Sequence, residues 1–371
     1  MSDDIPQPDR VEGAPHPRET PLLFGQQAAE EVFLQAHNSG RRHHGWLISG
    51  PQGLGKATLA WRIAKFLLAT PPQDGGGLFG APPPPETLEI SGDHPVSHRI
   101  QALSDPGLFL LRRAWDDKAK RLKTQLTVDE VRKLKSFFSL SSAEGGRRVV
   151  IVDSMDELNT SAANAILKLL EEPPARTTLL MVAHQPSRLL PTIRSRCREL
   201  RLAPLGPDDM ARALGQAGAD VATEDAQALA ALSSGSVGAA MRLLNNDGLR
   251  LYGQIIRLIG TLPRLDRPGA IALGESTAGK VNEARLDLVL GLADIAMSRL
   301  ARTGVTGMPP APEAAPGEAE TMLRLAPDMA RGRAWAQLAQ DAGDRARHAR
   351  AVNVDPAALV LDLILQMHKI A

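Results

Sequence analysis

Residues 50–58, GPQGLGKAT, have the types and spacing that bind phosphate. Gly50, Gly55 and Lys56 fit the pattern G-x-x-x-x-G-K-[ST], in which glycines let backbone N–H groups close around a phosphate and the lysine neutralises its charge. The position of the Mg²⁺-binding hydroxyl in this pattern holds Ala57, and Thr58 lies one residue later, about 100° further round a helix. The stretch predicts a nucleotide site in which one metal ligand is missing.

A second candidate residue stands at the end of an apolar run. Residues 149–152 are valine and isoleucine, a β-branched sequence that is typical of a strand buried on both faces. Asp153 follows directly, which is the Walker B arrangement, where a carboxylate helps to hold Mg²⁺. The residue after it is Ser154. The candidate nucleotide-binding residues are Gly50, Gly53, Gly55, Lys56, Thr58 and Asp153.

The elements that must position these residues alternate between strands and helices. Short apolar runs predict strands at 46–48, 108–111, 149–152, 178–183 and 198–202. Apolar residues at helical spacing predict helices at 25–38, 59–67, 127–140 and 160–172. The alternation predicts an α/β domain whose parallel sheet is covered on both faces.

The rest of the chain is predicted to be helical. Three short helices are expected at 208–216, 223–233 and 236–244. Longer ones are expected at 249–262, 285–302, 322–341 and 356–370, with a linker at 303–319. The whole therefore predicts a sheet domain, a small helical domain and an all-α C-terminal domain.

Two proline-rich segments predict irregular structure. Residues 1–21 are acidic and have no apolar region of the kind found in signal peptides, so we expect a disordered tail. Residues 71–97 predict a surface insertion. His94 and His98 lie four apart, but Pro95 stands between them, which favours surface histidines over a helical metal pair.

Composition excludes several classes of protein. The net charge of the 371 residues is +1 and aromatic residues make up 3%, which argues against a strongly basic protein or a base-stacking surface. A single cysteine, Cys197, excludes an internal disulfide and a multi-cysteine zinc site, and it fits a reducing cytoplasm. No apolar run reaches the about 20 residues of a membrane helix, so we expect a soluble, cytoplasmic protein.

Two further motifs carry a resemblance to a known family. NAILKLLEEPP at residues 164–174 is followed by an apolar strand and then by SRC at residues 195–197. With the phosphate-loop pattern, this combination resembles the clamp-loader branch of the AAA+ ATPases, as found in bacterial DNA polymerase III. The resemblance covers residues 22 to about 245 by motif, and the remaining helices match the family's collar domain only in kind. It implies an AAA+ domain at 22–205, a helical lid at 206–245 and a helical collar at 246–371.

The resemblance implies a role in DNA replication. Clamp loaders are five-subunit rings that open a sliding clamp and place it on primed DNA, with ATP between neighbouring subunits. The partners would be loader subunits of the gamma/tau and delta kinds. The family's arginine finger lies in the SRC motif, which puts it on Arg196, acting in a neighbour's ATP site. Alternatively, Arg196 pairs with a carboxylate of its own domain.

Three departures from the family's pattern fall around one site. A working AAA+ ATPase has a glutamate after the Walker B aspartate to activate water, where this chain has Ser154. Asp156 and Glu157 follow, and we expect them to face elsewhere. The motor subunits carry an arginine at the position of Gly238, and Ala57 replaces the metal-binding hydroxyl. Together these losses predict a subunit with little or no ATPase activity and weak or absent binding of ATP and Mg²⁺.

Several alternatives stay open. The chain is a stator-like ring subunit or, as the alternative, an ATP-hydrolysing motor of the gamma/tau or branch-migration kind. The polar sensor residue of the family falls on His184 or Gln185. Zinc is not expected, because residues 71–97 contain no cysteine where the family's motors carry a zinc module. The basic residues after the second strand are either DNA phosphate ligands or a solvated loop: Arg112, Arg113, Lys118, Lys120, Arg121 and Lys123.

Overall fold

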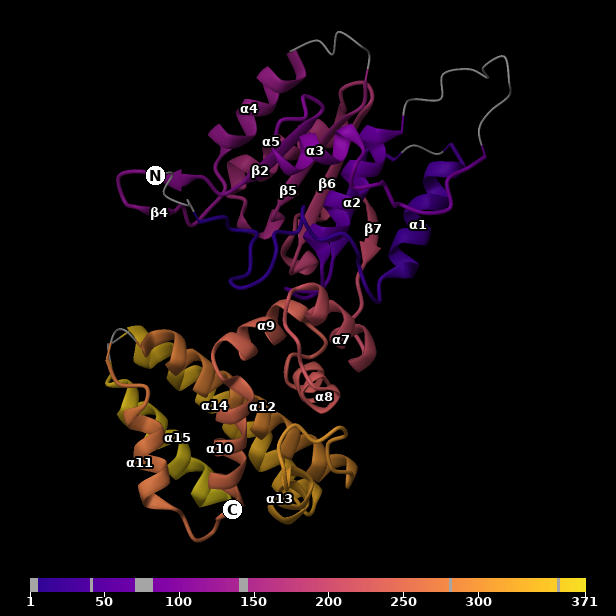
Figure 1. Cartoon of the computed structure of the whole chain (residues 1–371). Helices are drawn as coiled ribbons and strands as arrows, with labels where there is room; N and C mark the ends of the chain where they lie inside the picture. The colour runs from indigo at the N-terminus through magenta and orange to yellow at the C-terminus, as the bar shows by residue number, and fades with distance from the viewer. Residues whose placement is uncertain (1–5, 41–42, 71–82, 140–145, 280–281, 352–353) are drawn as a thin grey trace. The chain divides into compact units, whose positions relative to one another are not determined.

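The computed structural model describes residues 6–40, 43–70, 83–139, 146–279, 282–351 and 354–371 (Figure 1). The chain forms two compact units. The first contains the residues up to Leu205 together with 212–219 and 236–238. The second contains 206–211, 220–235 and 239–371. The residues of the predicted lid are divided between the units, and the predicted domain boundaries stay predictions.

A five-stranded parallel sheet is the centre of the first unit. Its strands are β1 (Gly45–Ser49), β2 (Leu108–Arg112), β5 (Arg148–Asp153), β6 (Thr177–Ala183) and β7 (Arg198–Arg201). They lie in the order β2-β5-β6-β1-β7, and all neighbouring strands are parallel. β-branched and leucine side chains fill both faces, because helices cover a parallel sheet on both sides. The predicted α/β class with a parallel sheet is confirmed.

Helices form a layer on each face of this sheet (Figure 1). One face is covered by α1 (Gln27–Asn38), α2 (Lys56–Ala69) and α3 (Pro95–Gln101). The other is covered by α4 (Val128–Ser139), α5 (Thr160–Glu171) and α6 (Pro191–Arg194). Successive strand residues point to opposite layers, so Ile48 packs with the first and Leu47 with the second.

Short elements follow the carboxyl ends of three strands. The single-turn helices η1 (Met155–Glu157) and η2 (Pro186–Arg188) follow β5 and β6. A small antiparallel hairpin of β3 (Trp115–Asp116) and β4 (Arg121–Leu122) follows β2. The sequence did not predict this hairpin, because two-residue strands give no periodic signal.

The predicted insertion at 71–97 differs from the structure at its end. Residues 71–82 lie outside the described residues, but α3 already begins at Pro95. Proline suits the first position of a helix, where its missing N–H is not needed. His94 caps this helix, since its Nδ1 accepts from the backbone N–H of Val96 at 3.2 Å. The expectation of irregular structure up to residue 97 is therefore wrong for the last three residues.

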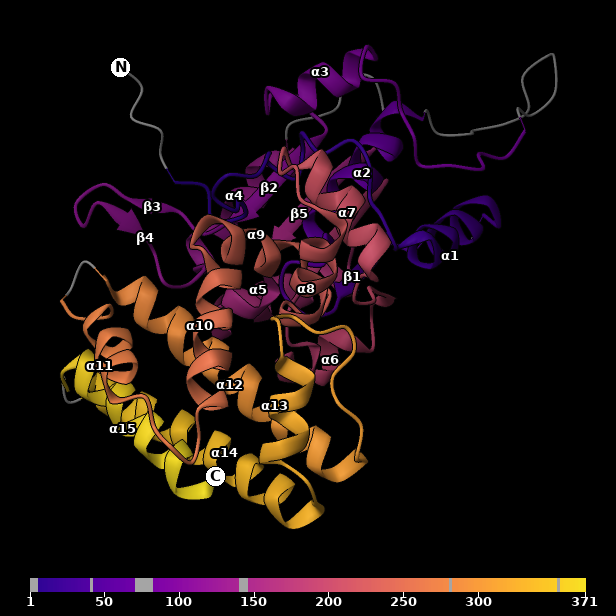
Figure 2. The ribbon, with the colours of Figure 1, turned by 60° about the horizontal axis from the view of Figure 1, so that its bottom comes forward.

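Helices make up the second unit, which confirms the predicted all-α C-terminal region (Figure 2). Its helices are α8 (Thr223–Leu232), α10 (Gly248–Gly260), α11 (Arg267–Glu275), α12 (Glu283–Thr306), α13 (Glu318–Leu325), α14 (Met329–Ala351) and α15 (Pro356–Ile370). α7 (Pro207–Gln216) and α9 (Val237–Asn245) contribute residues to both units. No helix of the described residues is long and apolar enough to span a membrane.

Three details of the second unit differ from the sequence prediction. The helix expected at 322–341 is two helices, α13 and α14, and α11 was not predicted. The linker expected at 303–319 begins only after α12 ends at Thr306, and α13 starts before it would end. α12 packs along α14, where a Cβ on Gly304 would lie 2.6 Å from the Cα of Gly332. The two glycines therefore allow the helix backbones to approach closely.

Candidate functional site

The predicted phosphate loop joins β1 to α2, in the strand–loop–helix setting that the pattern requires. Gly53 and Gly55 have φ values of +82° and +89°, in the left-handed region that favours glycine. A Cβ on Gly55 would lie 2.6 Å from Cδ1 of Leu23, and a Cβ on Gly53 would collide with the Ser236 side chain. The loop therefore depends on glycine for its conformation and for its contacts.

The side chain of Lys56 is hydrogen-bonded to the backbone of its own phosphate loop. Its side chain is buried, and Nζ donates to the carbonyl oxygen of Gly50 at 2.7 Å and to that of Pro51. Burial lowers the pKa of Lys56 to about 8, against the opposing charges of Asp153 and Asp156. The ammonium group is thus satisfied by backbone oxygens at the place where a working phosphate loop would offer it to phosphate.

The position next to Lys56 presents a methyl group. Ala57 is partly buried and Thr58 is buried within α2, with 7% of its surface exposed. A hydroxyl in that environment packs inside the domain. Neither residue offers an exposed oxygen beside the loop.

Asp153 ends β5 at the carboxyl edge of the sheet, in register with Arg112 of β2. Burial raises the pKa of Asp153 to about 7, and the negative charges of Asp9 and Glu157 act in the same direction. The positive charges of Lys56 and Arg112 oppose this rise. A carboxyl group with such a pKa is only partly ionised at neutral pH, which weakens it as a metal ligand.

The two acidic residues after Ser154 lie near this edge. Glu157 pairs with Arg113 at 2.8 Å between Oε2 and Nε. Asp156 accepts hydrogen bonds from the backbone N–H groups of His184 and Gln185 at 2.5 and 2.8 Å. The charge of Asp156 acts on Lys56, and that of Glu157 acts on Asp153. The turn η1 brings both carboxylates back to the carboxyl edge, but both are engaged in other contacts.

Ser154 and His184 complete the polar groups at this edge. Ser154 is 2% exposed, and within the described residues its Oγ makes no hydrogen bond. His184 is partly buried, and burial together with the charge of Lys56 lowers its pKa to about 4. Gln185 is exposed. The two candidates for the polar sensor therefore differ in their environment, and the choice between them stays open.

Residues 236–238 pack on the phosphate loop within the first unit. Ser236 Oγ donates to the carbonyl oxygen of Gln52 at 2.8 Å, and the N–H of Gly238 donates to that of Gly53 at 3.1 Å. Gly238, which stands where the motors have an arginine, thus contributes its backbone to the loop and no positive side chain.

Arg196 lies on the surface between α6 and β7. Its side chain is 38% exposed, and Nη2 pairs with Oε1 of Glu171 at 2.9 Å, while Nη1 donates to the carbonyl oxygen of Thr192 at 3.0 Å. The pairing with a carboxylate of its own domain is therefore present. An exposed pair of this kind contributes about 0–1 kcal/mol, so a stronger anionic partner can replace Glu171.

The basic residues after β2 divide into two groups. Arg112 pairs with Asp9 and Arg113 with Glu157, so both are held within the domain. Lys118, Lys120 and Arg121 are exposed on the hairpin of β3 and β4. Lys123, just after the hairpin, is partly buried, so the hairpin cations are the most exposed of these six residues.

The raised pKa of Asp153 predicts how the free energy of unfolding depends on pH. Its carboxyl pKa is raised from 3.8 to about 7, so the folded chain holds a proton that the unfolded chain releases between these values. The stability that the protonated Asp153 contributes is fully present below about pH 4, and it is lost as the pH rises to about 7. Relative to the wild type, Asp153→Asn is expected to gain up to about 4 kcal/mol over this range, because one pKa unit corresponds to about 1.4 kcal/mol.

Urea unfolding of both proteins at several pH values measures this difference. Asp117→Asn is the matched control, since Asp117 is exposed on the hairpin. Parallel pH profiles for the wild type and Asp153→Asn would contradict the raised pKa.

Part of the chain is similar to known proteins. The family described as "DNA polymerase III, delta subunit" matches residues 25–206. The delta' subunit of DNA polymerase III from Pseudomonas aeruginosa is 34% identical over 221 residues, 60% of this chain and 61% of that protein. Its counterpart from Escherichia coli is 32% identical over 217 residues, 58% of this chain and 59% of that protein. Residues 25–206 of this chain are therefore similar to the delta' subunits of DNA polymerase III.

The similarity to the delta' subunits covers only part of each chain. The matched regions span about three fifths of the length of the two delta' relatives. The gamma subunit from Buchnera aphidicola is 25% identical over 256 residues, which cover 68% of this chain and 64% of that protein. The matched residues 25–206 contain Lys56, Asp153 and Arg196, but neither Gly238 nor the N-terminal segment.

Proposed function

We propose that this chain is a delta-prime subunit of the clamp loader of DNA polymerase III. It acts as a stator in a five-subunit ring with subunits of the gamma/tau and delta kinds, and the ring loads the sliding clamp on primed DNA during replication. Arg196 is the arginine finger that it donates to the ATP site of a neighbour. The observation that carries the proposal is the exposed Arg196 in Ser-Arg-Cys, in a chain whose own nucleotide site lacks its catalytic groups.

The residues of the chain's own nucleotide site favour the role of a stator over that of an ATP-hydrolysing motor. Ser154 stands where a motor has its general base, and loss of a base costs about 10²–10⁴ in rate. Asp153 is only partly ionised near neutral pH, Lys56 is bound to loop carbonyls, and Gly238 has no side chain to offer. Each of these features lowers hydrolysis by the chain itself.

The donor set fits Mg²⁺ and ATP poorly. A methyl group and a half-protonated carboxyl replace the hydroxyl and carboxylate ligands that Mg²⁺ requires. We propose that bound nucleotide, where present, is weak and is not turned over. Zinc is not part of the proposal, because residues 71–97 contain no cysteine.

Reconstitution with gamma/tau and delta subunits tests the proposal. The chain is expected to co-purify with them and to be required for clamp loading on primed DNA, while the chain alone shows no measurable ATP hydrolysis. Failure to enter the complex would overturn the stator role. Hydrolysis by the chain alone that Lys56→Ala abolishes would favour the motor alternative.

A further inference from the structure

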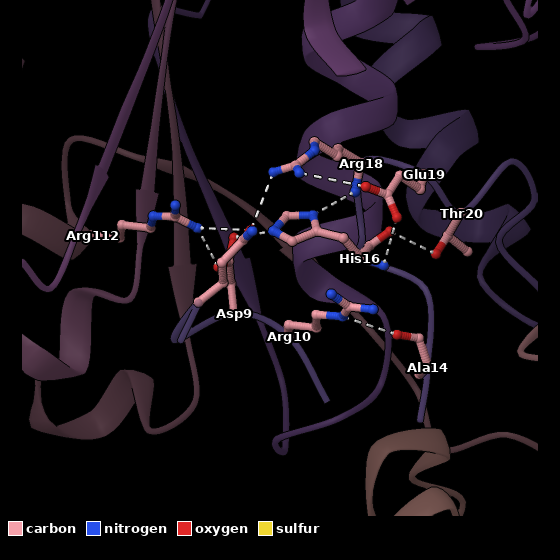
Figure 3. A network of polar contacts seen from close by, with 9 residues as sticks. Asp9, Arg10, Ala14, His16, Arg18, Glu19, Thr20 and Arg112 are labelled. Carbon is pink, nitrogen blue, oxygen red and sulfur yellow. Dashed lines mark hydrogen bonds and ion pairs between the residues drawn. The ribbon is translucent and has the colours of Figure 1, made fainter. Parts of the chain in front are cut away.

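Residues 6–23 form an ordered strap along the carboxyl edge of the sheet, which we call the N-terminal strap (Figure 3). The sequence predicted disorder for residues 1–21. Residues 1–5 lie outside the described residues, but from residue 6 onward the chain makes successive turns with buried side chains. The tail differs from the prediction because its order depends on contacts with residues far along the chain.

Asp9 attaches the strap beside the Walker B position. Its side chain is only 1% exposed, and Oδ1 lies 2.7 Å from Nη1 of Arg112. Arg112 is the register partner of Asp153 on the neighbouring strand. The same guanidinium nitrogen donates to Oε1 of Gln7 at 3.3 Å. A buried negative charge from the strap thus stands next to the carboxyl end of β5, and it is one of the charges that act on Asp153.

His16 holds the opposite side of the Asp9 carboxylate (Figure 3). Its Nε2 lies 3.0 Å from Oδ2 of Asp9, and its Nδ1 accepts from the backbone N–H of Arg18 at 3.1 Å. Because Nδ1 accepts, the ring proton is on Nε2, the nitrogen that lies 3.0 Å from the carboxylate. Burial disfavours ionisation of Asp9, but the hydrogen bond from His16 and the charge of Arg112 hold its pKa below the usual value. Asp9 is therefore ionised.

The far end of the strap rests on the phosphate loop and its helix. The ring of His16 packs edge-on against Trp61 of α2, with 6.0 Å between centroids. Arg62 of α2 donates to the carbonyl oxygen of Pro21. Leu23 lies against Gly55, 2.6 Å from the place where a Cβ would be. The strap consequently contacts both the Walker B side and the phosphate-loop side of the candidate site.

We propose that the N-terminal strap and a nucleoside polyphosphate compete for the carboxyl edge of the sheet. The strap brings an ionised carboxylate to the edge where Asp153 and the phosphate loop would meet the phosphates. Asp9 repels phosphate and also neutralises the Arg112 guanidinium that would otherwise attract it, so phosphate binds more weakly while Asp9 is in place. The strap thus suppresses nucleotide binding in the isolated chain. This competition depends on the phosphate loop and the parallel sheet of the first unit, and it does not depend on the proposed role as a clamp-loader subunit.

Titration of the full chain with a fluorescent ATP analogue and Mg²⁺ tests the competition. Asp9→Asn is expected to bind the analogue about tenfold more tightly than the wild type, a difference easily resolved in Kd. His16→Ala, which releases the same carboxylate from its other side, is expected to shift Kd in the same direction. Asp117→Asn is the matched control and is expected to bind as the wild type does. Adding Lys56→Ala to Asp9→Asn should abolish the gain, since the gain requires the phosphate loop.

Hydrogen exchange on the wild-type chain provides a second measurement that needs no variant. Saturating ATP analogue is expected to speed amide exchange in residues 6–23 while it protects residues 50–58. Equal Kd values for the wild type, Asp9→Asn and His16→Ala, or no binding by any of them, would overturn the proposal. So would unchanged exchange of the strap on addition of the analogue. Co-purification with loader subunits can succeed or fail whatever these measurements show.

Discussion

Arg196→Ala is expected to slow ATP hydrolysis at the neighbouring site of a reconstituted loader by about 10³–10⁵, the range of arginine fingers that act in trans. The guanidinium stabilises the charge that develops on the transferring phosphoryl group, and the alanine variant leaves that charge without its donor. The fold should be unaffected, because the side chain is 38% exposed and its pair with Glu171 lies on the surface. Single-turnover hydrolysis by the assembled ring measures the effect.

Two further variants separate the finger from a general change in surface charge. Arg194→Ala removes an exposed arginine two residues away on α6 and is expected to leave hydrolysis unchanged. Arg196→Lys keeps the charge but loses the planar set of donors, and it is expected to restore little of the rate. Wild-type kinetics in the Arg196→Ala ring would reject the assignment of the finger.

Arg299→Met is expected to lower the free energy of unfolding of the second unit by about 3–5 kcal/mol, because it leaves a buried carboxylate without its cation. Glu318 is completely buried, and its Oε1 lies 2.7 Å from Nε of Arg299. The hydroxyl of Tyr252 donates to the same oxygen at 2.5 Å, and the N–H of Ala314 donates to Oε2 at 2.6 Å. These two donors are neutral, so they cannot replace the guanidinium charge.

Urea unfolding followed by far-UV circular dichroism measures this loss. Arg302→Met, an exposed arginine on the same helix, is the matched control and is expected to change stability by less than about 0.5 kcal/mol. A double variant, Arg299→Met with Glu318→Gln, should recover much of the loss, since the neutral amide removes the unpaired buried charge and its oxygen can still accept a hydrogen bond from the buried donors. If the double variant is as unstable as Arg299→Met, lost packing rather than the stranded carboxylate is the cause.

Much of the first unit follows from local sequence signals. The β-branched run before Asp153 and the glycines at 50, 53 and 55 predict a strand and a loop, and the structure has both. The helix that begins after Asn159 could be predicted from its cap, since the Asn159 side chain accepts from the N–H of Ala162 at 2.9 Å. These signals depend on neighbours within a few residues, so the sequence alone is enough.

The arrangement around the site depends on contacts between distant residues. Asp9 meets Arg112 across about a hundred positions, and nothing local in an acidic, proline-rich segment indicates that partner. Asp156 holds the backbone of His184 and Gln185, which decides how the two candidate sensor residues face. The extra helix α11 contains a proline and two glycines, so its sequence resembles a turn until tertiary packing stabilises it.

The glycines of the phosphate loop have a second task that is separate from nucleotide. Gly55 makes room for Leu23, Gly53 makes room for Ser236, and Lys56 fastens the loop to itself through Gly50 and Pro51. A mutation at any of them would damage the domain even in a protein that never met ATP. The glycines and the lysine can therefore be retained for structural reasons after ATP hydrolysis has been lost. A phosphate-loop sequence therefore shows common ancestry with nucleotide-binding proteins. Whether the protein hydrolyses ATP depends on the catalytic groups beside the loop.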